Sequence, residues 1–297
     1  MADATGAPAA AAAGRPDPPM PELPEVELVA RALDRLIAGR RFASAKLLRA
    51  GLAPENTPRE FARALRGARV ERVGRRGKHI LAETDNGRVL ITHLRMTGRF
   101  VLLRPRAPLP KHTHALFRLD DGRRLAFTDQ RHFGMMKVAL AERLSEERSL
   151  RGLAPEPFSA EFTPDYLASV LARTRKSLKD VLLDQRRVTG LGNIYAAEAL
   201  HLARVNPFGE AARLPRRQVA RLHRAILEVL GEALAHGSTM NVDPENIEGS
   251  YFGGGGYTGR WRVYDREGEP CRRCREAVRR VSLAGRSTYF CARCQQP

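Results

Sequence analysis

Apolar residues recur at helical spacing close to the start of the sequence. The positions that share one helical face are Val26, Val29, Ala30, Leu33, Leu36 and Ile37. Acidic residues occupy the turn before them and Gly39 follows, and both are common signals at the ends of a helix. We therefore predict an amphipathic helix from Pro24 to Gly39 with one face buried in a core.

Short apolar runs separated by turn signals dominate residues 41 to 140. Val89 to Leu94 and Phe100 to Leu103 are two such runs, and Asn86-Gly87 and Asp121-Gly122 are two such turns. Dipeptides of this kind favour two-residue hairpins because they tolerate positive φ at both central positions. Several antiparallel strands at this spacing predict a β-sandwich.

The pattern becomes helical after Pro155-Glu156-Pro157. Helix starts are indicated near Thr163, Ser177, Ile194 and Pro215. Residues 237 to 260 are glycine-rich and predict a loop, and all the cysteines follow it. The expected fold class is α+β, with an N-terminal helix and antiparallel β-sandwich followed by a helical domain that carries a small finger.

The charge balance is strongly basic. Lys and Arg number 51 against 33 Asp and Glu, which gives a net charge of +18. Codon bias toward arginine explains part of the composition but not the net charge. Guanidinium forks suit phosphate, so the charge favours a nucleic acid as partner.

The sequence contains no run of about 18 apolar residues, which excludes a membrane-spanning helix. Residues 1 to 19 contain Arg15 as their only base and lack the apolar centre of a secretion signal, so we predict a disordered extension. We expect a cytoplasmic protein that is associated with the nucleoid through DNA.

The four cysteines form two pairs near the end of the chain. They are Cys271, Cys274, Cys291 and Cys294. Two CxxC knuckles supply the four thiolates of a tetrahedral zinc site, and no coordination position remains open for catalysis. We predict one structural Zn²⁺ and no organic cofactor. The residues between the knuckles include Arg279, Arg280 and Arg286, which a finger can present to phosphate.

The segment Met20-Pro21-Glu22-Leu23-Pro24-Glu25 reads like the start of a protein. A proline that follows a removed initiator methionine carries a secondary amine, and α-amino groups titrate near pH ~8. Such an amine can attack an electrophilic carbon and form an iminium. With residues 1 to 19 attached, the Pro21 nitrogen is an inert amide. We therefore expect Met20 to be the initiator.

These features resemble those of the formamidopyrimidine-DNA glycosylases, and the resemblance covers residues 20 to 296. The motifs that carry it, in order, are the start segment, Gly77-Lys78, His93-Leu94-Arg95-Met96-Thr97-Gly98, Asp129-Gln130-Arg131-His132-Phe133-Gly134, Gly192-Asn193-Ile194-Tyr195 and Gly285-Arg286-Ser287-Thr288. The implied substrate is double-stranded DNA with oxidised bases, and the implied assembly is a monomer.

The resemblance implies roles for four catalytic residues. Pro21 attacks the sugar carbon that bears an oxidised purine such as 8-oxoguanine and expels the base. Glu22 is the general acid and base. Lys78 contacts the phosphate beside the lesion and assists β-elimination, and Arg286 grips that phosphate and assists δ-elimination.

The resemblance also implies DNA-binding residues. Met96, Arg131 and Phe133 fill the space that the flipped nucleotide leaves, Phe133 as a wedge and Arg131 as a partner of the orphaned cytosine. Asn193 and the helix amides beside it form a phosphate site, although an N-cap is the plainer interpretation of Asn193. The further phosphate contacts are His112, Lys179 and Arg175.

The implied domains are a disordered extension (1–19), a catalytic β-sandwich (20–154), a helix-two-turn-helix domain (155–240), a lesion-capping loop (241–260) and a zinc finger (261–297). The sequence departs from the family pattern where Arg95 and Asp265 replace usual glycines, at Asp180, and over residues 240 to 259.

Three alternatives stay open. An endonuclease VIII-like enzyme would remove oxidised pyrimidines, and the departures in the capping loop leave the base preference unsettled. A non-catalytic binder of damaged DNA would result if Pro21 were not the mature N-terminus. A zinc-finger transcription factor would bind a specific sequence, but it gives no reason for the start segment.

Overall fold

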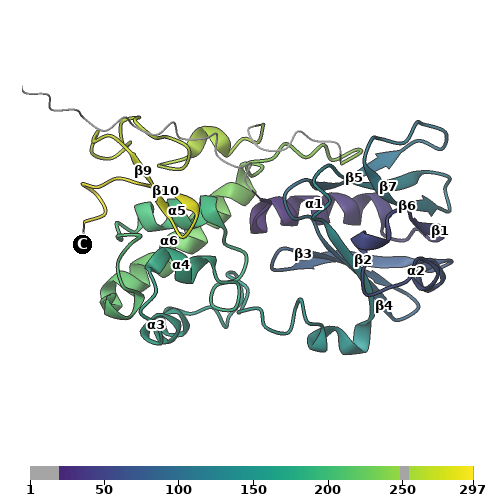
Figure 1. Cartoon of the computed structure of the whole chain (residues 1–297), viewed down its shortest axis with the longest axis horizontal. Coiled ribbons are helices and arrows are strands. Elements are labelled where there is room, and N and C mark those ends of the chain that lie inside the picture. The colour runs from purple at the N-terminus through teal and green to yellow at the C-terminus, as the bar shows by residue number, and fades with distance from the viewer. Residues whose placement is uncertain (1–19, 248–253, 297) are drawn as a thin grey trace, which may run out of the picture.

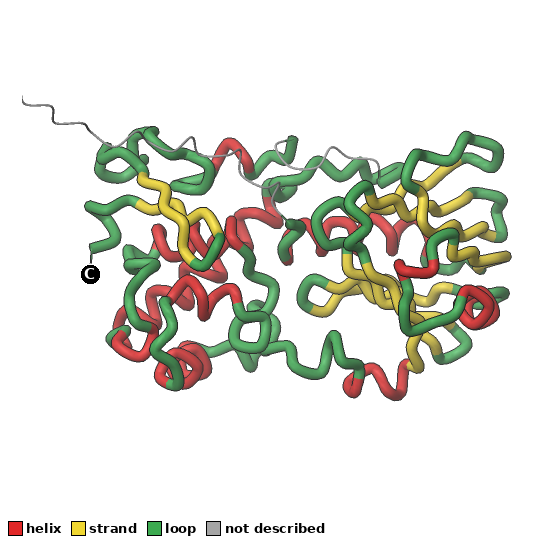
Figure 2. Tube along the Cα trace, in the orientation of Figure 1, coloured by secondary structure: helices red, strands yellow, loops and turns green. Residues whose placement is uncertain are grey.

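The computed structural model describes residues 20–247 and 254–296. The predicted extension over residues 1–19 lies outside the described residues, as does part of the predicted capping loop. The chain forms two lobes that lie side by side along its long axis, a β lobe and a helical lobe (Figure 1). Figure 2 shows that strands fill one lobe and helices the other. The α+β class is therefore confirmed.

Helix α1 (Leu23–Ile37) begins at the junction of the two lobes. A capping box holds its start. The Glu22 side chain accepts the backbone N–H of Glu25, and the Glu25 side chain accepts the backbone N–H of Glu22. Leu23 packs in the core of the helical lobe, whereas Val26 and the later apolar residues pack in the core of the β lobe. Gly39 ends the helix with φ 79°. The predicted helix is confirmed, and its start is anchored in both lobes.

The β lobe is a sandwich of two four-stranded antiparallel sheets. One sheet has the order β1 (Phe42–Leu47), β6 (Thr113–Leu119), β7 (Arg124–Asp129), β5 (Gly98–Leu103). The other has the order β2 (Val70–Arg76), β3 (His79–Thr84), β4 (Arg88–His93), β8 (Met135–Leu140). Both predicted hairpin turns are present, with Gly87 at φ 70° and Gly122 at φ 85°.

Residues 41 to 140 are not all strand, contrary to the sequence prediction. They include η1 (Ala50–Leu52) and helix α2 (Pro58–Leu65). Thr57 and Glu60 form a capping box at the start of α2, and Phe61 and Leu65 are buried. This signal was present in the sequence but is only two turns long, so the surrounding strand pattern obscured it.

The helical lobe contains α3 (Pro164–Ala172), α4 (Leu178–Leu183), α5 (Asn193–Leu202), η3 (Ala211–Arg213) and α6 (Arg216–Ala235). Thr163 and Ser177 cap α3 and α4 through their side-chain oxygens, as predicted. Helix α5 is buried along almost its whole length, so it forms the centre of this lobe.

The finger packs on the helical lobe. It contains an antiparallel hairpin of β9 (Arg279–Leu283) and β10 (Arg286–Phe290), and the short helix η4 (Thr258–Arg260) lies in the loop before it. The remaining short helix, η2 (Ala141–Glu146), belongs to the β lobe. The buried Glu198 of α5 accepts the backbone N–H groups of Arg262 (2.7 Å), Val263 (2.9 Å) and Tyr264 (2.9 Å). This carboxylate therefore fixes the chain where the finger begins.

The segment after α6 crosses back to the β lobe. Ile247 packs in the core of that lobe, and the Leu102 N–H donates to the Asn246 carbonyl at 2.9 Å. Together with α1 and the chain near Glu156, it connects the lobes and fixes the space between them. None of the helices in the described ranges is long and apolar enough to cross a membrane.

Candidate active site and nucleic-acid interface

The Glu22 carboxylate lies at the N-terminus of α5, 170 residues further along the chain. It accepts the backbone N–H groups of Gly192 (2.5 Å), Ile194 (2.8 Å) and Tyr195 (3.3 Å). Free N–H groups and the helix dipole make such a terminus a site for a negative charge. Glu22 is 2% exposed. Its position directly after Pro21 therefore places that residue at the same junction.

Two glycines allow α1 and α5 to approach this closely. A Cβ on Gly190 would lie 2.5 Å from Leu23 Cδ1, and a Cβ on Gly192 would lie 2.5 Å from Glu22 Cδ. Gly190 also has φ 83°. The Gly190-Leu191-Gly192 turn is thus required by the contact with the start segment and not only by chain reversal.

Glu25 holds Glu22 in place through a hydrogen bond to its backbone. Its carboxylate accepts the Glu22 N–H at 2.9 Å, the Tyr195 hydroxyl at 2.6 Å and the Thr239 hydroxyl at 2.8 Å. Glu25 is fully buried. It joins α1, α5 and the chain after α6, so it holds the start segment in one position.

Lys78 lies in the turn between β2 and β3, as predicted, but it is buried. Its ammonium donates to the Leu191 carbonyl at 2.8 Å, next to the residues that bind Glu22. Burial raises the pKa of Glu22 to about 7, and the Lys78 charge opposes that rise. Burial likewise lowers the pKa of Lys78, and the Glu22 charge opposes that fall. The pair combines an acid that titrates near neutrality with a primary amine.

The finger turn lies beside this pair. Ser287 follows Arg286, and its carbonyl accepts from Lys179 Nζ at 2.7 Å and Asn193 Nδ2 at 3.0 Å. Arg286 itself is exposed, and its charge contributes to lowering the pKa of both Lys78 and Lys179. Burial is the main cause of the shift at Lys179, whose pKa falls to about 8. The turn therefore brings an exposed guanidinium close to two buried amines.

Two sequence interpretations of this region need correction. Asn193 is not the N-cap of α5, because Gly192 occupies that position and Asn193 is the first helical residue. The helix amides that the sequence argument assigned to a phosphate bind the Glu22 carboxylate instead. Lys179 is 1% exposed and anchors the finger turn, and its role as a phosphate contact stays a prediction.

Met96, Arg131 and Phe133 lie on two neighbouring loops at the end of the β lobe. The buried Asp129 carboxylate accepts from the Thr97 hydroxyl, from the Arg131 N–H at 3.2 Å and from the Gly134 N–H at 2.6 Å. Phe133 is 51% exposed, and the Arg131 guanidinium carbon lies 5.1 Å from its ring centroid. Asp129 therefore holds an exposed aromatic ring and a cation beside the Met96 turn.

Among the described residues, neither His112 nor Arg175 shares a hydrogen bond or ion pair with Glu22. The His112 carbonyl accepts the Asp129 N–H at 3.0 Å, so this exposed residue belongs to the loop cluster. The Arg175 side chain is 93% exposed and lies 3.9 Å from Glu210. Within the described residues, no hydrogen bond or ion pair joins Arg175 to the other candidate residues. Both stay predictions as phosphate contacts.

Sequence reasoning missed Glu156 as a functional position. It bonds to Arg75 at 2.5 Å, to Arg76 at 2.8 Å and to the Gly77 N–H at 2.7 Å. These contacts tie the chain between the lobes to the hairpin that carries Lys78. The flanking prolines marked the lobe boundary, but only the fold shows what the carboxylate binds.

The four cysteine sulfurs all lie within 4.8 Å of one another. Cys271 and Cys294 Sγ are 4.0 Å apart, and Cys274 and Cys291 Sγ are 3.4 Å apart. Tetrahedral zinc with Zn–S bonds of about 2.3 Å has sulfurs about 3.8 Å apart. The donor set fits one structural zinc, as predicted.

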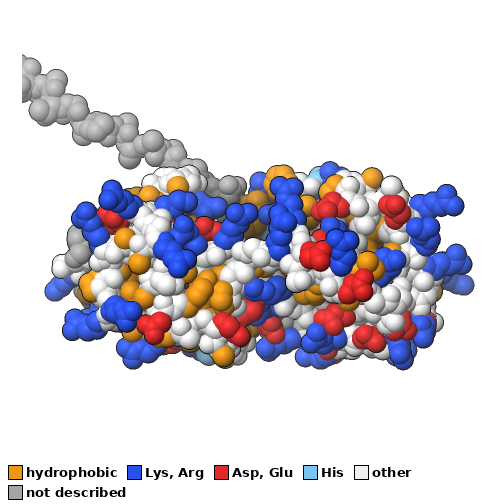
Figure 3. Space-filling model, turned by 90° about the horizontal axis from the view of Figure 1, so that it is seen from below, with side chains coloured by type: hydrophobic (Ala, Val, Ile, Leu, Met, Phe, Trp, Pro, Cys, Tyr) orange, Lys and Arg blue, Asp and Glu red, His pale blue; other side chains and the backbone are white. Residues whose placement is uncertain are grey.

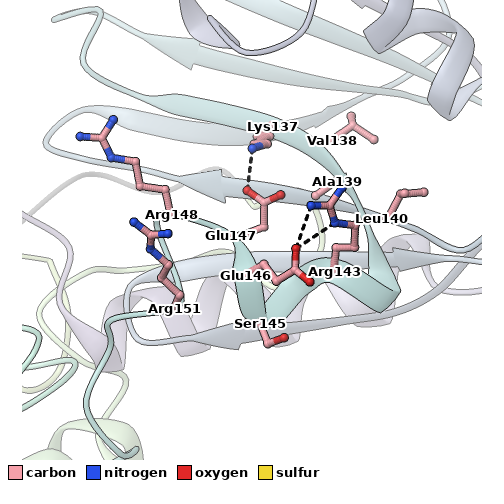
Figure 4. A pocket seen from close by; sticks show the side chains of 10 residues that line it. All are labelled: Lys137, Val138, Ala139, Leu140, Arg143, Ser145, Glu146, Glu147, Arg148 and Arg151. Atoms are coloured by element: carbon pink, nitrogen blue, oxygen red, sulfur yellow. Dashed lines mark hydrogen bonds and ion pairs between the residues drawn. The ribbon is translucent and has the colours of Figure 1, made fainter.

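A surface hollow of about 790 Å³ lies on the outside of the β lobe, between β8 and η2 (Figure 4). Four of its charged groups form two local ion pairs, Lys137 with Glu147 and Arg143 with Glu146. None of the candidate catalytic or DNA-binding residues lines it. The chemistry is concentrated at the junction of the lobes and not in this hollow.

A basic finger turn beside a buried acid and lysine fits an enzyme that acts on nucleic acid better than a regulator that only reads a base sequence. Three family models match the chain. They describe the formamidopyrimidine-DNA glycosylase N-terminal domain over residues 20–136, the H2TH domain of the same enzymes over residues 153–243, and a zinc finger found in FPG and IleRS over residues 268–297.

Similar proteins of the same description cover nearly the whole chain. The formamidopyrimidine-DNA glycosylase of Bacillus licheniformis is 42% identical over 279 residues, which span 92% of this chain and 98% of the relative. That of Desulforamulus reducens is 40% identical, with 92% and 98% covered. A structure of Lactococcus lactis Fpg with DNA that contains an abasic site is 31% identical, covers 93% of this chain and 100% of its own, and has a TM-score of 0.85. The chain belongs to the formamidopyrimidine-DNA glycosylase family.

Proposed function

We propose that the protein is a bifunctional DNA glycosylase and AP lyase of base excision repair, which removes oxidised purines from duplex DNA. The observation that carries the proposal is the burial of Glu22 beside Lys78, directly after Pro21. A carboxyl group with a pKa of about 7 is present in both protonation states at neutral pH, as a general acid and base must be.

The sequence of events begins with the Pro21 amine, which attacks the sugar carbon that bears the damaged base. The bond from that carbon to the base breaks, and the base leaves with the bonding electrons. The N–H proton of the attached amine is lost and neutralises the departed base. Glu22 donates a proton to the ring oxygen as the bond from the sugar carbon to that oxygen breaks, and the product is an iminium. Loss of the two flanking phosphates by β- and then δ-elimination leaves a one-nucleotide gap.

The remaining residues hold the DNA in this scheme. Phe133, Arg131 and Met96 fill the space that the flipped nucleotide leaves, because an exposed ring, a cation and a flexible thioether lie on two loops that Asp129 joins. Arg286 and Lys78 face the phosphates beside the lesion, and Asn193 holds the Arg286 turn. His112, Arg175 and Lys179 have weaker support, Lys179 because it is buried.

The proposed domains are the β-sandwich over residues 20–154, the helix-two-turn-helix domain over 155–240, the capping loop over 241–260 and the finger over 261–297. The described start of the capping loop crosses to the β lobe, where Ile247 packs in the core. Because DNA is the substrate, we place the enzyme at the nucleoid in the cytoplasm.

One other substrate class and one other function have support of their own. Lactococcus lactis Fpg, 32% identical to this chain, has also been solved with DNA that contains an oxidised pyrimidine. A binder without catalysis follows from chemistry alone wherever residues 1–19 precede Pro21, since the nitrogen is then an amide. The active form in our proposal begins at Pro21.

The test uses a chain that begins at Pro21 and end-labelled duplexes with a single 8-oxoguanine or a single oxidised pyrimidine. The proposal predicts faster cleavage at 8-oxoguanine and phosphate groups at both ends of the gap. Preferred cleavage at the pyrimidine would instead support the endonuclease VIII-like alternative. Tight lesion binding without cleavage would support the binder.

A further inference from the structure

A second group of basic side chains lies in the helical lobe, and we call it the distal arginine cluster. Its members are Arg204, Arg217, Arg221, Arg224 and Arg273. Residues 217, 221 and 224 follow helical spacing, so they share one face of α6 over about 10 Å. Arg204 lies just after α5, and Arg273 lies in the first cysteine knuckle. Three separate elements therefore bring cations to one surface.

The cluster lies far from Glu22. Asn193 begins α5 and Arg204 follows its end, and a helix of 10 residues is about 15 Å long. In the finger, Arg286 lies at the hairpin turn and Arg273 at the cysteine end, separated by strands of five residues, or about 17 Å. Both elements place the two groups of cations at opposite ends. A duplex at the junction of the lobes thus leaves the distal arginine cluster uncovered.

The positive charges of the cluster are not neutralised by acidic side chains of the described residues. Within residues 20–247 and 254–296, no ion pair holds any of its five side chains, and the buried Nε of Arg221 has no hydrogen-bond acceptor. Burial, followed by the charges of Arg217, Arg204, Arg273 and Arg224, lowers the pKa of the Arg221 guanidinium. Mutual repulsion of this kind destabilises the fold unless an anion binds.

An adjoining hollow extends the cationic surface. It has a volume of about 400 Å³ and is lined by His201, Glu232, Arg260, Arg262, Arg272 and Arg273. Glu232 is already occupied, because both of its oxygens accept from Arg262 at 2.9 Å. Arg260, Arg272 and Arg273 are exposed. The surface therefore offers guanidinium groups over a wider area than one small anion covers.

The chemistry of the surface favours a phosphodiester backbone. Its cations are all guanidinium groups, which suit phosphate oxygens. The residues that line the adjoining hollow include no Phe, Tyr or Trp, and aromatic rings are what single-stranded nucleic acid usually stacks on. Duplex DNA carries one negative charge about every 1.7 Å along its axis, so a row of about 10 Å faces several phosphates.

We propose that the distal arginine cluster binds the backbone of a second duplex segment while the lesion-bearing duplex occupies the junction near Glu22. Such a contact carries no base specificity. It lets one enzyme molecule touch two segments of DNA, so it can transfer between them without first dissociating into solution. The inference depends on DNA binding at the junction but not on catalysis.

A bridging experiment tests the proposal. The enzyme is saturated with an immobilised short duplex that contains a tetrahydrofuran site, and a labelled undamaged duplex is then added. We expect the wild-type chain to capture the second duplex. The variant R217Q/R221Q/R224Q should capture at least about tenfold less, and its salt slope (log K against log salt) should be shallower by about 2 to 3.

The matched control is R59Q/R63Q/R66Q, which removes three exposed arginines from the end and face of α2 in the β lobe. It changes the net charge equally and should capture the second duplex like the wild type. Thermal unfolding and binding of the tetrahydrofuran duplex show whether each variant is folded. Equal loss in both variants, or no capture by the folded wild type, would overturn the proposal.

Two further outcomes also count against it. If polyglutamate binds the wild type as tightly as the duplex does, and the α6 variant loses that binding, the surface fits an acidic polypeptide. If the α6 variant binds a long lesion duplex less tightly but captures the second duplex normally, the cluster contacts flanking DNA of the same molecule. Failure of catalysis alone leaves the capture result unchanged.

Discussion

Gly192 lies against Glu22 so closely that a Cβ added to the glycine would come within 2.5 Å of the Glu22 carboxyl carbon. The Gly192 N–H also donates to that carboxylate at 2.5 Å. Gly192 therefore fixes the position of Glu22, the proposed general acid, and with it the position of Pro21.

Gly192→Ala should consequently displace Glu22. Because backbone and carboxylate both resist movement, we expect a loss of stability of about 1 to 3 kcal/mol and a fall in cleavage rate of about a hundredfold. Gly231→Ala is the matched control, since a Cβ there meets no atom within 4 Å and the site lies inside α6. That change should stabilise the protein by about 0.5 to 1 kcal/mol. Thermal unfolding and single-turnover cleavage measure both effects.

Glu22 should also give the protein a characteristic pH dependence. The fold raises the pKa of Glu22 from its ordinary value of 4.5 to about 7, so the folded state binds a proton more tightly than the unfolded state. The free energy of unfolding should therefore fall as the pH rises from about 4.5 to about 7, by up to about 3 kcal/mol. Below that window the contribution is fully present, and above it the contribution is lost.

The comparison of the wild type with Glu22→Gln isolates this effect. Denaturant titrations should show that the difference in the free energy of unfolding between the two proteins changes between about pH 4.5 and pH 7, because Gln cannot ionise. A difference that does not change with pH would contradict the assignment.

Asp129→Asn should loosen the two loops that carry Met96 and Phe133. The amide nitrogen cannot accept the N–H and O–H groups that the carboxylate accepts now, and an unsatisfied buried group costs about 1 to 3 kcal/mol. We expect binding to a tetrahydrofuran duplex to weaken by about tenfold or more. Phe133→Ala, which removes the exposed ring but leaves Asp129 intact, should weaken binding without lowering the thermal midpoint.

Glu156→Gln should separate the chain between the lobes from the Lys78 hairpin. It removes the charge that pairs with Arg75 and Arg76, and these groups are partly buried, so we expect a loss of about 1 to 3 kcal/mol. Elimination at a preformed abasic site should slow, because Lys78 loses its support. The exposed pair Arg143 and Glu146 offers a control, and Glu146→Gln should change stability by less than about 0.5 kcal/mol.

Local signals predicted most of the secondary structure. Thr163 and Ser177 cap helices, Gly87 and Gly122 take the positive φ of hairpin turns, and the cysteine knuckles come together as their spacing indicates. Each of these features depends on residues within a few positions of one another. The short helix over Pro58–Leu65 carried the same kind of signal and was missed because its surroundings read as strands.

Long-range contacts could not be predicted in the same way. Three buried side chains each bond to residues more than a hundred positions away: Glu22 to the N-terminus of α5, Glu25 to Thr239, and Lys179 to the finger turn. The sequence resemblance named Glu22 and Lys179 but gave neither their burial nor their partners. Arg95 and Asp265, which stand where the family usually has glycine, both adopt φ 54°, so the backbone keeps the conformation that glycine favours.

The central claim is that the Pro21 amine is the nucleophile. The most direct measurement is borohydride trapping on an 8-oxoguanine duplex with two preparations, one that begins at Pro21 and one that retains residues 1–19. The account predicts a covalent protein–DNA adduct attached to Pro21 with the first preparation, little adduct after Pro21→Gly, and none with the second preparation. A folded, lesion-binding chain that begins at Pro21 and yields no adduct would contradict the account.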